Sequence, residues 1–554
     1  MPTIIDNTIS QIKSAIIKAA GVDSAAPDFA IERPANPDHG DYSANAAMVW
    51  AKTLGQNPRS IAEGIVANID TADTFIKSLS VAGPGFINIT LADNYYAAVL
   101  DSVRGSGADY GRSDYGGGQK VMVEFVSANP TGPMHIGNAR GGALGDCLAS
   151  VLEWSGHKVC REFYINDAGN QIINLGYSLE ARYMQIFDES FPFPEDGYQG
   201  PDVIELAAGF AKTNGDSLVN SDSESRRETL INYALPINID KLRRDLLKYR
   251  IEYDVWFKES SLHNSGEVDR VIDILKAGGH TYEQDGALWL KATEVGEEKD
   301  KILIRANGTP TYVVPDIAYH YNKFITRGFD VVINILGADH HGYSQQLKHS
   351  VEALGLKDKQ LEFVLTQMVR LMRDGQPVKA SKRTGKSITL STLLDEVPLD
   401  AARFFFNMRE SDTHLDFDLD LAIEQSNKNP VYYVQYAHAR ICSIIKNLAA
   451  EGVEPRECSL DELTQLAEPQ ERDLIRHLGE FPGEIILAAK VREPARITRY
   501  VYELATLFHK FYNACRVKCD DDSLMQARLT LCQCALTTLA NALAILKVDA
   551  PENM

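Results

Sequence analysis

The chain has 554 residues, of which 44% are hydrophobic and 24% are charged, and its formal net charge is −20. This length exceeds one compact core and predicts three or four domains at about 100–200 residues each. The composition excludes a disordered or fibrous protein, and the acidic balance excludes a nucleic-acid coat protein that binds by charge alone. The charge balance does not exclude a nucleic-acid enzyme whose basic groups are gathered on one face.

Residues 1–112 predict a small α+β domain. Isoleucines from Ile5 to Ile16 recur at the spacing of one helix face, and an extended segment and a helix starting near Asn94 follow. The start of the chain lacks the cationic and apolar regions of a signal peptide. The stretch 104–120 is rich in glycine and polar residues, which is typical of a linker.

Residues 113–393 alternate strands and helices. A buried strand over 121–126, a turn, a long helix and a second strand over 158–165 form a β-α-β unit. Such a unit predicts a Rossmann-like parallel sheet of the α/β class, with its binding crevice at the carboxyl ends of the strands. We expect a helical insertion around 180–275. Later runs expected in strands are 301–306, 311–316, 331–336 and 363–369.

From residue 394 the pattern is helical to the end of the chain. We expect connecting helices over 394–430 and an all-α domain over 431–554. Within these parts, helices are predicted over 399–410, 430–449, 470–489, 494–517 and 523–547.

Two simple features bear on location and metal binding. No apolar run reaches about 18 residues, so we expect no membrane-spanning helix, no membrane partner and a cytoplasmic protein. Eight cysteines form no disulfide framework. The four nearest the C-terminus have spacings unlike a zinc knuckle, so we expect buried thiols and no bound metal.

The turn after the first strand, NPTGPMHIGN, is the first candidate site. It contains Pro130, Gly132, His135, Gly137 and Asn138. Glycine and proline let the backbone approach a ligand, and the following helix presents free N–H groups and partial positive charge to a phosphate. His135 and Asn138 can donate to phosphoryl oxygens, and Gly137 leaves room for a flat base. A lone histidine is more often structural, but its place between strand and helix favours function.

The second candidate site is the loop VKASKRTGKS, which begins at residue 378. Its Lys379, Ser381 and Lys382 suit a transient array of negative charge such as a leaving pyrophosphate. The alternative is a solvated basic turn. The ending Gly-Lys-Ser is not a P-loop, because Ala380 stands where that motif requires glycine.

Together, the His-x-Gly turn and the Lys-Ala-Ser-Lys loop resemble the paired signatures of class I aminoacyl-tRNA synthetases. The longer stretches are similar to arginyl-tRNA synthetases of the bacterial type over essentially the whole chain. These stretches are HGDYSAN from residue 39, EFVSANPTGPMHIGNAR from 124, YVVPD from 312, DTHLDFD from 412 and NPVYYVQYAHAR from 429. Two positions depart from the family pattern. Asn138 stands where a second histidine is frequent, and Ala380 replaces the methionine of the lysine loop.

The resemblance implies ATP-dependent ligation of L-arginine to its tRNA through arginyl-adenylate, with release of AMP and pyrophosphate. Neither step needs an enzyme nucleophile, so catalysis consists of positioning and charge stabilisation. By resemblance, His135 and Asn138 contact the triphosphate and adenylate. Lys379 and Lys382, supported by Ser381 and by Mg²⁺, stabilise the departing pyrophosphate. We expect a monomer whose partners are ATP, arginine and tRNA.

By the same resemblance, the arginine-binding residues are Glu124, Asn129, Tyr312, Asp316 and His340. A guanidinium group requires carboxylates that accept paired hydrogen bonds, and Asp316 is the best candidate. The alternative for Asp316 is the N-cap of a helix. Glu124 lies in an otherwise apolar strand, where a buried carboxylate needs a partner. His340 beside two other possible ligands could suggest a metal site, but no third ligand has a familiar spacing.

The C-terminal part resembles the anticodon-binding domain of the family. Residues 490–518 hold seven basic residues against two acidic ones. Basic groups bind phosphates and aromatic rings stack on unpaired bases, although we expect most of the aromatic residues here to be core. The residues expected to contact tRNA are Tyr436, Arg440, Arg492, Arg496 and Arg499.

Two alternative functions remain open from the sequence. A small nucleotidyltransferase shares the His-x-Gly signature, but the helical C-terminal residues with their basic strip argue against it. An inactive relative that only binds RNA would have no need to keep His135, Lys379, Lys382 and Asp316.

Overall fold

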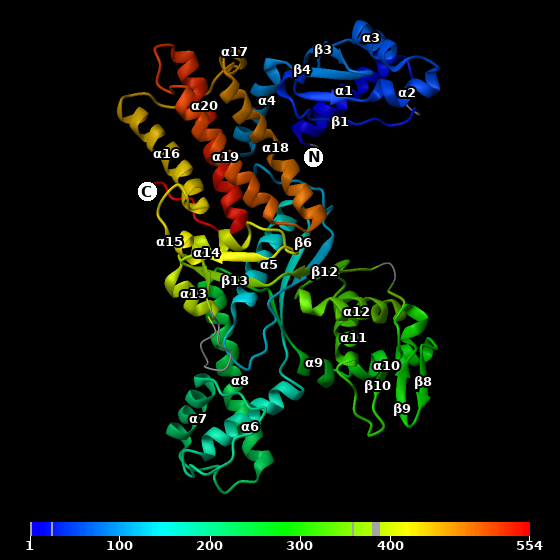
Figure 1. Ribbon diagram of the computed structural model, residues 1–554, viewed down its shortest axis with the longest axis vertical. Helices are drawn as coiled ribbons and strands as arrows, with labels where there is room; N and C mark the ends of the chain where they lie inside the picture. Colours follow the sequence, from blue (N-terminus) through cyan, green and yellow to red (C-terminus); the bar gives the residue numbers. More distant parts are fainter. Residues whose placement is uncertain (1–2, 24–25, 357–358, 379–387) are drawn as a thin grey trace.

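The computed structural model describes residues 3–23, 26–356, 359–378 and 388–554. The predicted positions Lys379, Ser381 and Lys382 therefore lie outside the described residues. A central sheet lies between the helical C-terminal domain above it and two lobes that extend away from it, and the N-terminal domain sits beside the upper end of the helices (Figure 1). The predicted mixed α/β fold, with an α+β N-terminal domain and an all-α C-terminal domain, is confirmed.

Five parallel strands form the central sheet in the order β12-β11-β5-β6-β7. The chain adds strands from β5 towards β7 on one side and towards β12 on the other, so the order reverses between β5 and β11. Open α/β sheets bind ligands outside the carboxyl ends of the strands at such a reversal. The strands are β5 (Lys120–Glu124), β6 (Lys158–Ile165), β7 (Val255–Lys258), β11 (Val331–Gly337) and β12 (Gln360–Thr366).

Helix α5 (Ile136–Trp154) crosses from β5 to β6 and is buried along most of its length. Its small residues allow a close approach to the sheet. A Cβ atom at Gly145 would lie 2.3 Å from the Phe125 ring, so only glycine fits there. The middle of α5 is thereby packed closely against Phe125, the residue after β5.

Two lobes are inserted in the chain between strands of the central sheet. The first has an apolar core of its own and consists of α6 (Asn170–Met184), α7 (Pro201–Asn214) and α8 (Ser223–Lys248). The second contains α9 (Glu259–Asn264), α10 (Glu267–Ala277), β8 (Thr281–Gln284), β9 (Ala287–Leu290), β10 (Lys301–Ile304), α11 (Val313–Tyr321) and α12 (His341–Ala353). The expected insertion around 180–275 is therefore not wholly helical, because β7 within it joins the central sheet.

The strand expected over 311–316 is wrong, because these residues lead into helix α11. Pro315 and Asp316 stand in its first turn, where the proline removes no intrahelical bond and the acid faces the positive end of the helix dipole. The β-branched pair before them gave the misleading strand pattern. The run expected over 363–369 divides between the end of β12 and the start of β13 (Val369–Arg373).

The connecting region is helical with one exception. Its helices are α13 (Leu390–Glu396), α14 (Leu399–Phe406) and α15 (Leu419–Ile423). The exception is β15 (Leu415–Asp418), which the helical expectation missed. It pairs with β13, and β13 also pairs with β14 (Gln376–Pro377).

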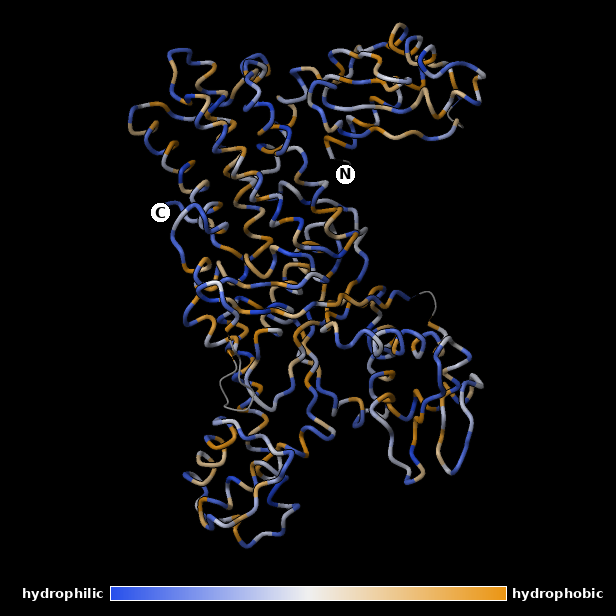
Figure 2. Tube along the Cα trace, viewed as in Figure 1, coloured by the Kyte–Doolittle hydropathy of each residue, from blue (hydrophilic) through white to orange (hydrophobic). Residues whose placement is uncertain are grey.

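The C-terminal domain is all-α, as predicted, and hydrophobic and hydrophilic residues alternate along its helices (Figure 2). Its helices are α16 (Pro430–Ala450), α17 (Leu460–Leu463), α18 (Pro469–Val491), α19 (Ala495–Ala514) and α20 (Asp522–Leu546). Helix α20 is long and apolar enough to cross a membrane, which the search for apolar runs missed, but 72% of its most apolar window is buried within the protein. Cys515, Cys532 and Cys534 are buried, and Cys519 is partly exposed.

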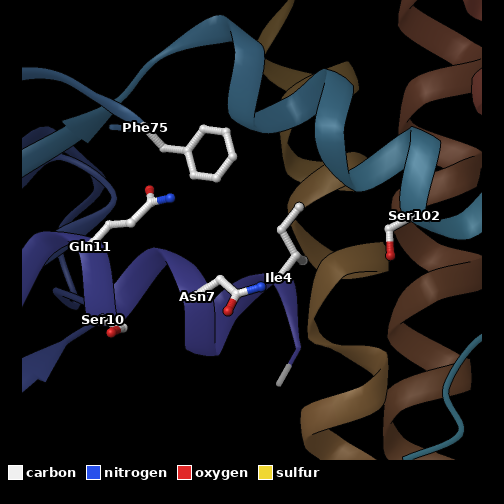
Figure 3. A pocket seen from close by; sticks show the side chains of 6 residues that line it. All are labelled: Ile4, Asn7, Ser10, Gln11, Phe75 and Ser102. Carbon is white, nitrogen blue, oxygen red and sulfur yellow. The ribbon is translucent and has the colours of Figure 1, made fainter. Parts of the chain in front are cut away.

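The N-terminal domain packs an antiparallel sheet, in the order β1-β2-β4-β3, against helices. Its elements are α1 (Ile4–Ala20), β1 (Ile31–Glu32), β2 (Tyr42–Ala44), α2 (Ala46–Leu54), α3 (Pro58–Asn68), β3 (Ile76–Ala82), β4 (Phe86–Leu91) and α4 (Asp93–Ser106). Arg476 and Arg472 of α18 form ion pairs with Asp41 and Asp93 of this domain. A small hollow between α1, the residue before β3 and α4 is lined by polar and apolar side chains (Figure 3).

A buried ion-pair cluster joins the sheet to the helical domain. Asp146 on α5 accepts from Arg161 at 3.2 Å and from Arg403 on α14 at 2.6 Å. Arg403 is fully buried and also donates to the Leu546 and Tyr249 carbonyl oxygens at 3.0 and 2.9 Å. One guanidinium thus links α14 to α5, to the end of α20 and to the residue after α8.

We expect Arg403→Met to destabilise the protein by about 3–5 kcal/mol, because it removes a cation from a buried carboxylate and donors from two buried carbonyls. Chemical denaturation followed by fluorescence measures this loss. Arg370→Met is the matched control, since it breaks the exposed Arg370–Asp416 pair and should change stability far less than Arg403→Met does. Equal effects of the two substitutions would contradict the linking role of Arg403.

Candidate active site

His135 and Asn138 cap the N-terminus of α5. The Gly137 N–H donates to His135 Nδ1 at 3.1 Å, and the His135 N–H donates to Asn138 Oδ1 at 3.1 Å. Because Nδ1 accepts, the neutral imidazole carries its proton on Nε2 and can donate from that atom. The Asn138 oxygen is used in the cap, which leaves the amide NH₂ as its donor to a ligand. The two predicted phosphate donors therefore share one turn at a helix N-terminus.

The first lobe supports the same turn from outside the sheet. Asn238 of α8, which is buried, donates its Nδ2 hydrogen to the Pro130 carbonyl oxygen at 2.9 Å. A Cβ atom at Gly132 would come within 3.6 Å of Asp202 at the start of α7. The predicted ATP position Pro130 thus contacts the lobe and Gly132 lies near it, and nothing in the sequence pattern identified this contact.

The lysine loop is anchored to this turn at its far end. Before the loop, the Val378 N–H donates to the Leu371 carbonyl at 2.8 Å. After it, Thr389 pairs with His135 in an isolated antiparallel bridge, and the Leu390 N–H donates to the Met134 carbonyl at 2.9 Å. The residues that follow the predicted lysines in the sequence therefore pair with the backbone of the predicted catalytic histidine.

The backbone beyond β5 is strained. Val126 and Ser127 have φ angles of 68° and 38°, a region that a β-branched valine rarely adopts. The bend is held by Tyr253, whose hydroxyl donates to the Phe125 carbonyl at 2.9 Å. The Ser127 hydroxyl donates to Glu124 Oε1 at 3.0 Å and accepts from the Tyr164 N–H at 3.1 Å. Asn129 is half-buried in the same loop.

A group of acidic side chains, Asp316, Glu259 and Glu124, lies beside this bend. Asp316 on α11 accepts a hydrogen bond from the Tyr343 hydroxyl on α12. Burial is the main cause that raises the pKa of Asp316 to about 7, and the charges of Glu259 and Glu124 act in the same direction. Burial likewise raises the pKa of Glu259, at the start of α9. These buried carboxyl groups lack sufficient positive charge around them. A cation that bound between them would therefore be stabilised by their negative charge.

The other two predicted arginine-binding residues are more exposed. Tyr312 precedes α11 with 68% of its surface exposed, and His340 precedes α12 with about half of its side chain exposed. The His340 and Tyr343 ring centroids are 6.4 Å apart. Glu259 and Tyr343 were missed by the sequence reasoning, although Glu259 directly follows a strand of the parallel sheet.

The predicted tRNA contacts fall into two groups. Arg492, Arg496 and Arg499 are each paired with a glutamate, namely Glu362, Glu484 and Glu410. In contrast, Arg440 on α16 donates to the Tyr436 hydroxyl at 2.7 Å, and its guanidinium lies 4.6 Å from the Tyr512 ring centroid. Three of the aromatic residues that follow the basic strip are core, as expected: Tyr500, Phe508 and Phe511.

The reversal of strand order between β5 and β11, the capped His-x-Gly turn at that point and the bridge from Thr389 back to His135 match a class I aminoacyl-tRNA synthetase. The sequence model described as "tRNA synthetases class I (R), catalytic domain" matches residues 106–445. The models "Arginyl tRNA synthetase N terminal domain" and "DALR anticodon binding domain" match residues 6–91 and 434–554.

Individual relatives agree with these matches. The chain is 52% identical over 562 residues to the arginine–tRNA ligase of Caldanaerobacter subterraneus subsp. tengcongensis, with 100% of both chains covered. It is 50% identical over 564 residues to that of Acetivibrio thermocellus, with the same coverage. The arginyl-tRNA synthetase structure of Thermus thermophilus shares the fold, with a TM-score of 0.75, 22% identity, and coverage of 98% of this chain and 100% of that one. The chain belongs to the arginyl-tRNA synthetase family.

The two roles of Asn138 can be separated by Asn138→Asp. The carboxylate keeps the acceptor that caps α5, so thermal stability should change little. It replaces the amide donor with negative charge beside the expected phosphate, so kcat/KM for ATP should fall by on the order of 10²-fold or more. Steady-state aminoacylation with ATP varied measures this. An unchanged kcat/KM would mean that Asn138 only caps the helix.

Proposed function

We propose how this chain's own residues carry out the reaction of its family. The chain is an enzyme that joins L-arginine to tRNA at the expense of ATP. In the first step the arginine carboxylate attacks the α-phosphorus of ATP and pyrophosphate leaves. In the second, the arginyl group passes to the terminal ribose of tRNA. The bridge between His135 and Thr389 is the observation that best supports this assignment, because it joins the turn and the loop that must act on one nucleotide.

In the activation step, His135 Nε2 and the Asn138 amide donate to the oxygens of the phosphate that is attacked. Pro130, Gly132 and Gly137 leave the backbone close to the nucleotide. Negative charge builds up on the departing pyrophosphate, and Lys379 and Lys382, with the Ser381 hydroxyl, are assigned to it. Donors aimed at charge that develops during a reaction lower the barrier most effectively, since they need no reorganisation.

Arginine is assigned to the acidic pocket. Asp316 is assigned to the guanidinium group, because burial and, to a smaller extent, the charges of Glu259 and Glu124 raise its pKa to about 7. Glu124 at the end of β5 and Asn129 in the loop beyond it are assigned to the same crevice. Tyr312 and His340 are assigned to the rim of the pocket. A planar cation with several donors matches paired carboxylates better than an ammonium does.

Mg²⁺ is assigned to the phosphate oxygens of ATP. Magnesium commonly binds through one or two carboxylates and substrate phosphates rather than in a protein cage. No cluster of three or more ligating side chains occurs within the described part of the chain. When bound, Mg²⁺ neutralises charge on the pyrophosphate.

The tRNA is assigned to the outer face of α16 and α19. Tyr436 stacks nearly parallel to Tyr432, with 6.5 Å between the ring centroids, and Arg440 lies beside them. Rings and a guanidinium in this arrangement suit unpaired bases. Arg492, Arg496 and Arg499 would bind phosphates by exchanging their glutamate partners.

We also propose a cytoplasmic monomer without a membrane partner, and domain limits at residues 112, 393 and 430.

The test is aminoacylation of total tRNA with ATP and each of the twenty amino acids. Arginine alone should become attached to tRNA. Lys382→Ala and Asp316→Ala should each reduce the rate by on the order of 10²-fold or more. Folded variants that charge tRNA as fast as the parent would contradict the site assignment. Tight tRNA binding without tRNA-dependent pyrophosphate exchange would instead indicate an inactive RNA-binding relative.

A further inference from the structure

Lys323 is completely buried beside the acidic pocket. Its Nζ atom lies 2.5 Å from Glu124 Oε2, 3.2 Å from Asn334 Oδ1 and 3.9 Å from the Tyr319 ring centroid. A carboxylate, an amide oxygen and an aromatic face therefore surround the ammonium group. Burial of a charge is costly without such partners, so this lysine and Glu124 depend on one another.

The backbone that carries Lys323 is itself fixed. It lies in a π-helical turn (Asn322–Thr326) that continues α11. The Asn322 amide donates to both carboxylate oxygens of Glu267 at 3.0 and 2.8 Å, and the Thr326 hydroxyl donates to Glu267 at 2.9 Å. Single π-turns are rare and occur frequently at functional sites. Here the turn directs Lys323 to the end of β5.

A chain of hydrogen bonds also leads from Lys323 to Asp316. Asn334 Nδ2 lies 2.9 Å from His320 Nε2, and His320 Nδ1 lies 2.8 Å from the Asp316 carbonyl oxygen. Burial lowers the pKa of His320 well below its ordinary value, so its ring is neutral. The only consistent assignment has Lys323 donating to Asn334, Asn334 to His320, and His320 to Asp316. The bonds therefore run in one direction, and Lys323 is their first donor.

We propose that Lys323 is a positioning residue for amino-acid selection. It fixes the Glu124 carboxylate directly and the segment that carries Asp316 through Asn334 and His320. The two acids are thereby held apart to receive one cationic amino acid. The inference rests on the proposed assignment of Glu124 and Asp316 to the arginine pocket.

The test is Lys323→Met, which keeps the length of the side chain and removes the charge. KM for arginine should rise at least tenfold, while KM for ATP and for tRNA should stay within twofold. The Lys323 charge lowers the pKa of Asp316, so the pH at which KM for arginine improves should also shift upwards. A purely structural role would lower the active fraction without this selective change. Lys359→Met is the control, since it breaks a partly exposed pair with Asp330 at the opposite end of the sheet.

Further variants keep the outcome decisive. Should Lys323→Met be insoluble, Asn334→Ala interrupts the same hydrogen-bond chain and should raise KM for arginine several-fold. If Lys323→Met folds and its KM for arginine is unchanged, while the KM of Asp316→Asn is raised, the role of Lys323 is overturned. The assignment of the pocket then still holds. An unchanged KM in Asp316→Asn as well overturns the pocket and the inference together. An equal loss for all substrates shows a structural role and also overturns it.

Discussion

The protein holds more negative than positive charge at the place where its parallel sheet changes strand order. The charges of Glu124 and Glu259 raise the pKa of Asp316, and burial prevents water from compensating these charges. Lys323 is paired with Glu124, and within the described part of the chain Asp316 has no ion-pair partner. An imbalance of this kind destabilises the empty protein slightly and favours a cationic ligand strongly. Under the proposed assignment, this imbalance is what selects arginine over neutral amino acids.

The fold places this excess of negative charge beside the turn that contains His135. Glu124 ends β5, and the strained residues after it lead directly into the His135 turn and α5. Close packing of α5 on Phe125, which requires Gly145, fixes the distance between the two parts of the site. The same helix carries Asp146, whose buried ion pair with Arg403 connects it to the helical domain. The site is thus supported by the sheet, the first lobe and the connecting helices.

Local patterns in the sequence predicted the parts that depend on local chemistry. The β-α-β unit, the start of α5 and the long C-terminal helices have short-range signals in hydrophobic periodicity and turn residues. The strand prediction for residues 311–316 failed, because a β-branched pair before a proline is compatible with both a strand and the start of a helix. The partners of Asp316 could not be found this way, since Tyr343 and Glu259 meet it only through the arrangement of three helices. Likewise, the glutamates that pair with Arg492, Arg496 and Arg499 become visible only once the domains are packed.

The central claim, that a buried and partly protonated Asp316 receives the substrate cation, is tested most directly by counting protons. Arginine binding is measured by calorimetry at pH 7 in two buffers with different ionisation enthalpies. With a pKa near 7 in the free protein, the account predicts release of about half a proton for each arginine bound, and none in Asp316→Asn. Identical binding heats in both buffers for the parent protein would contradict it.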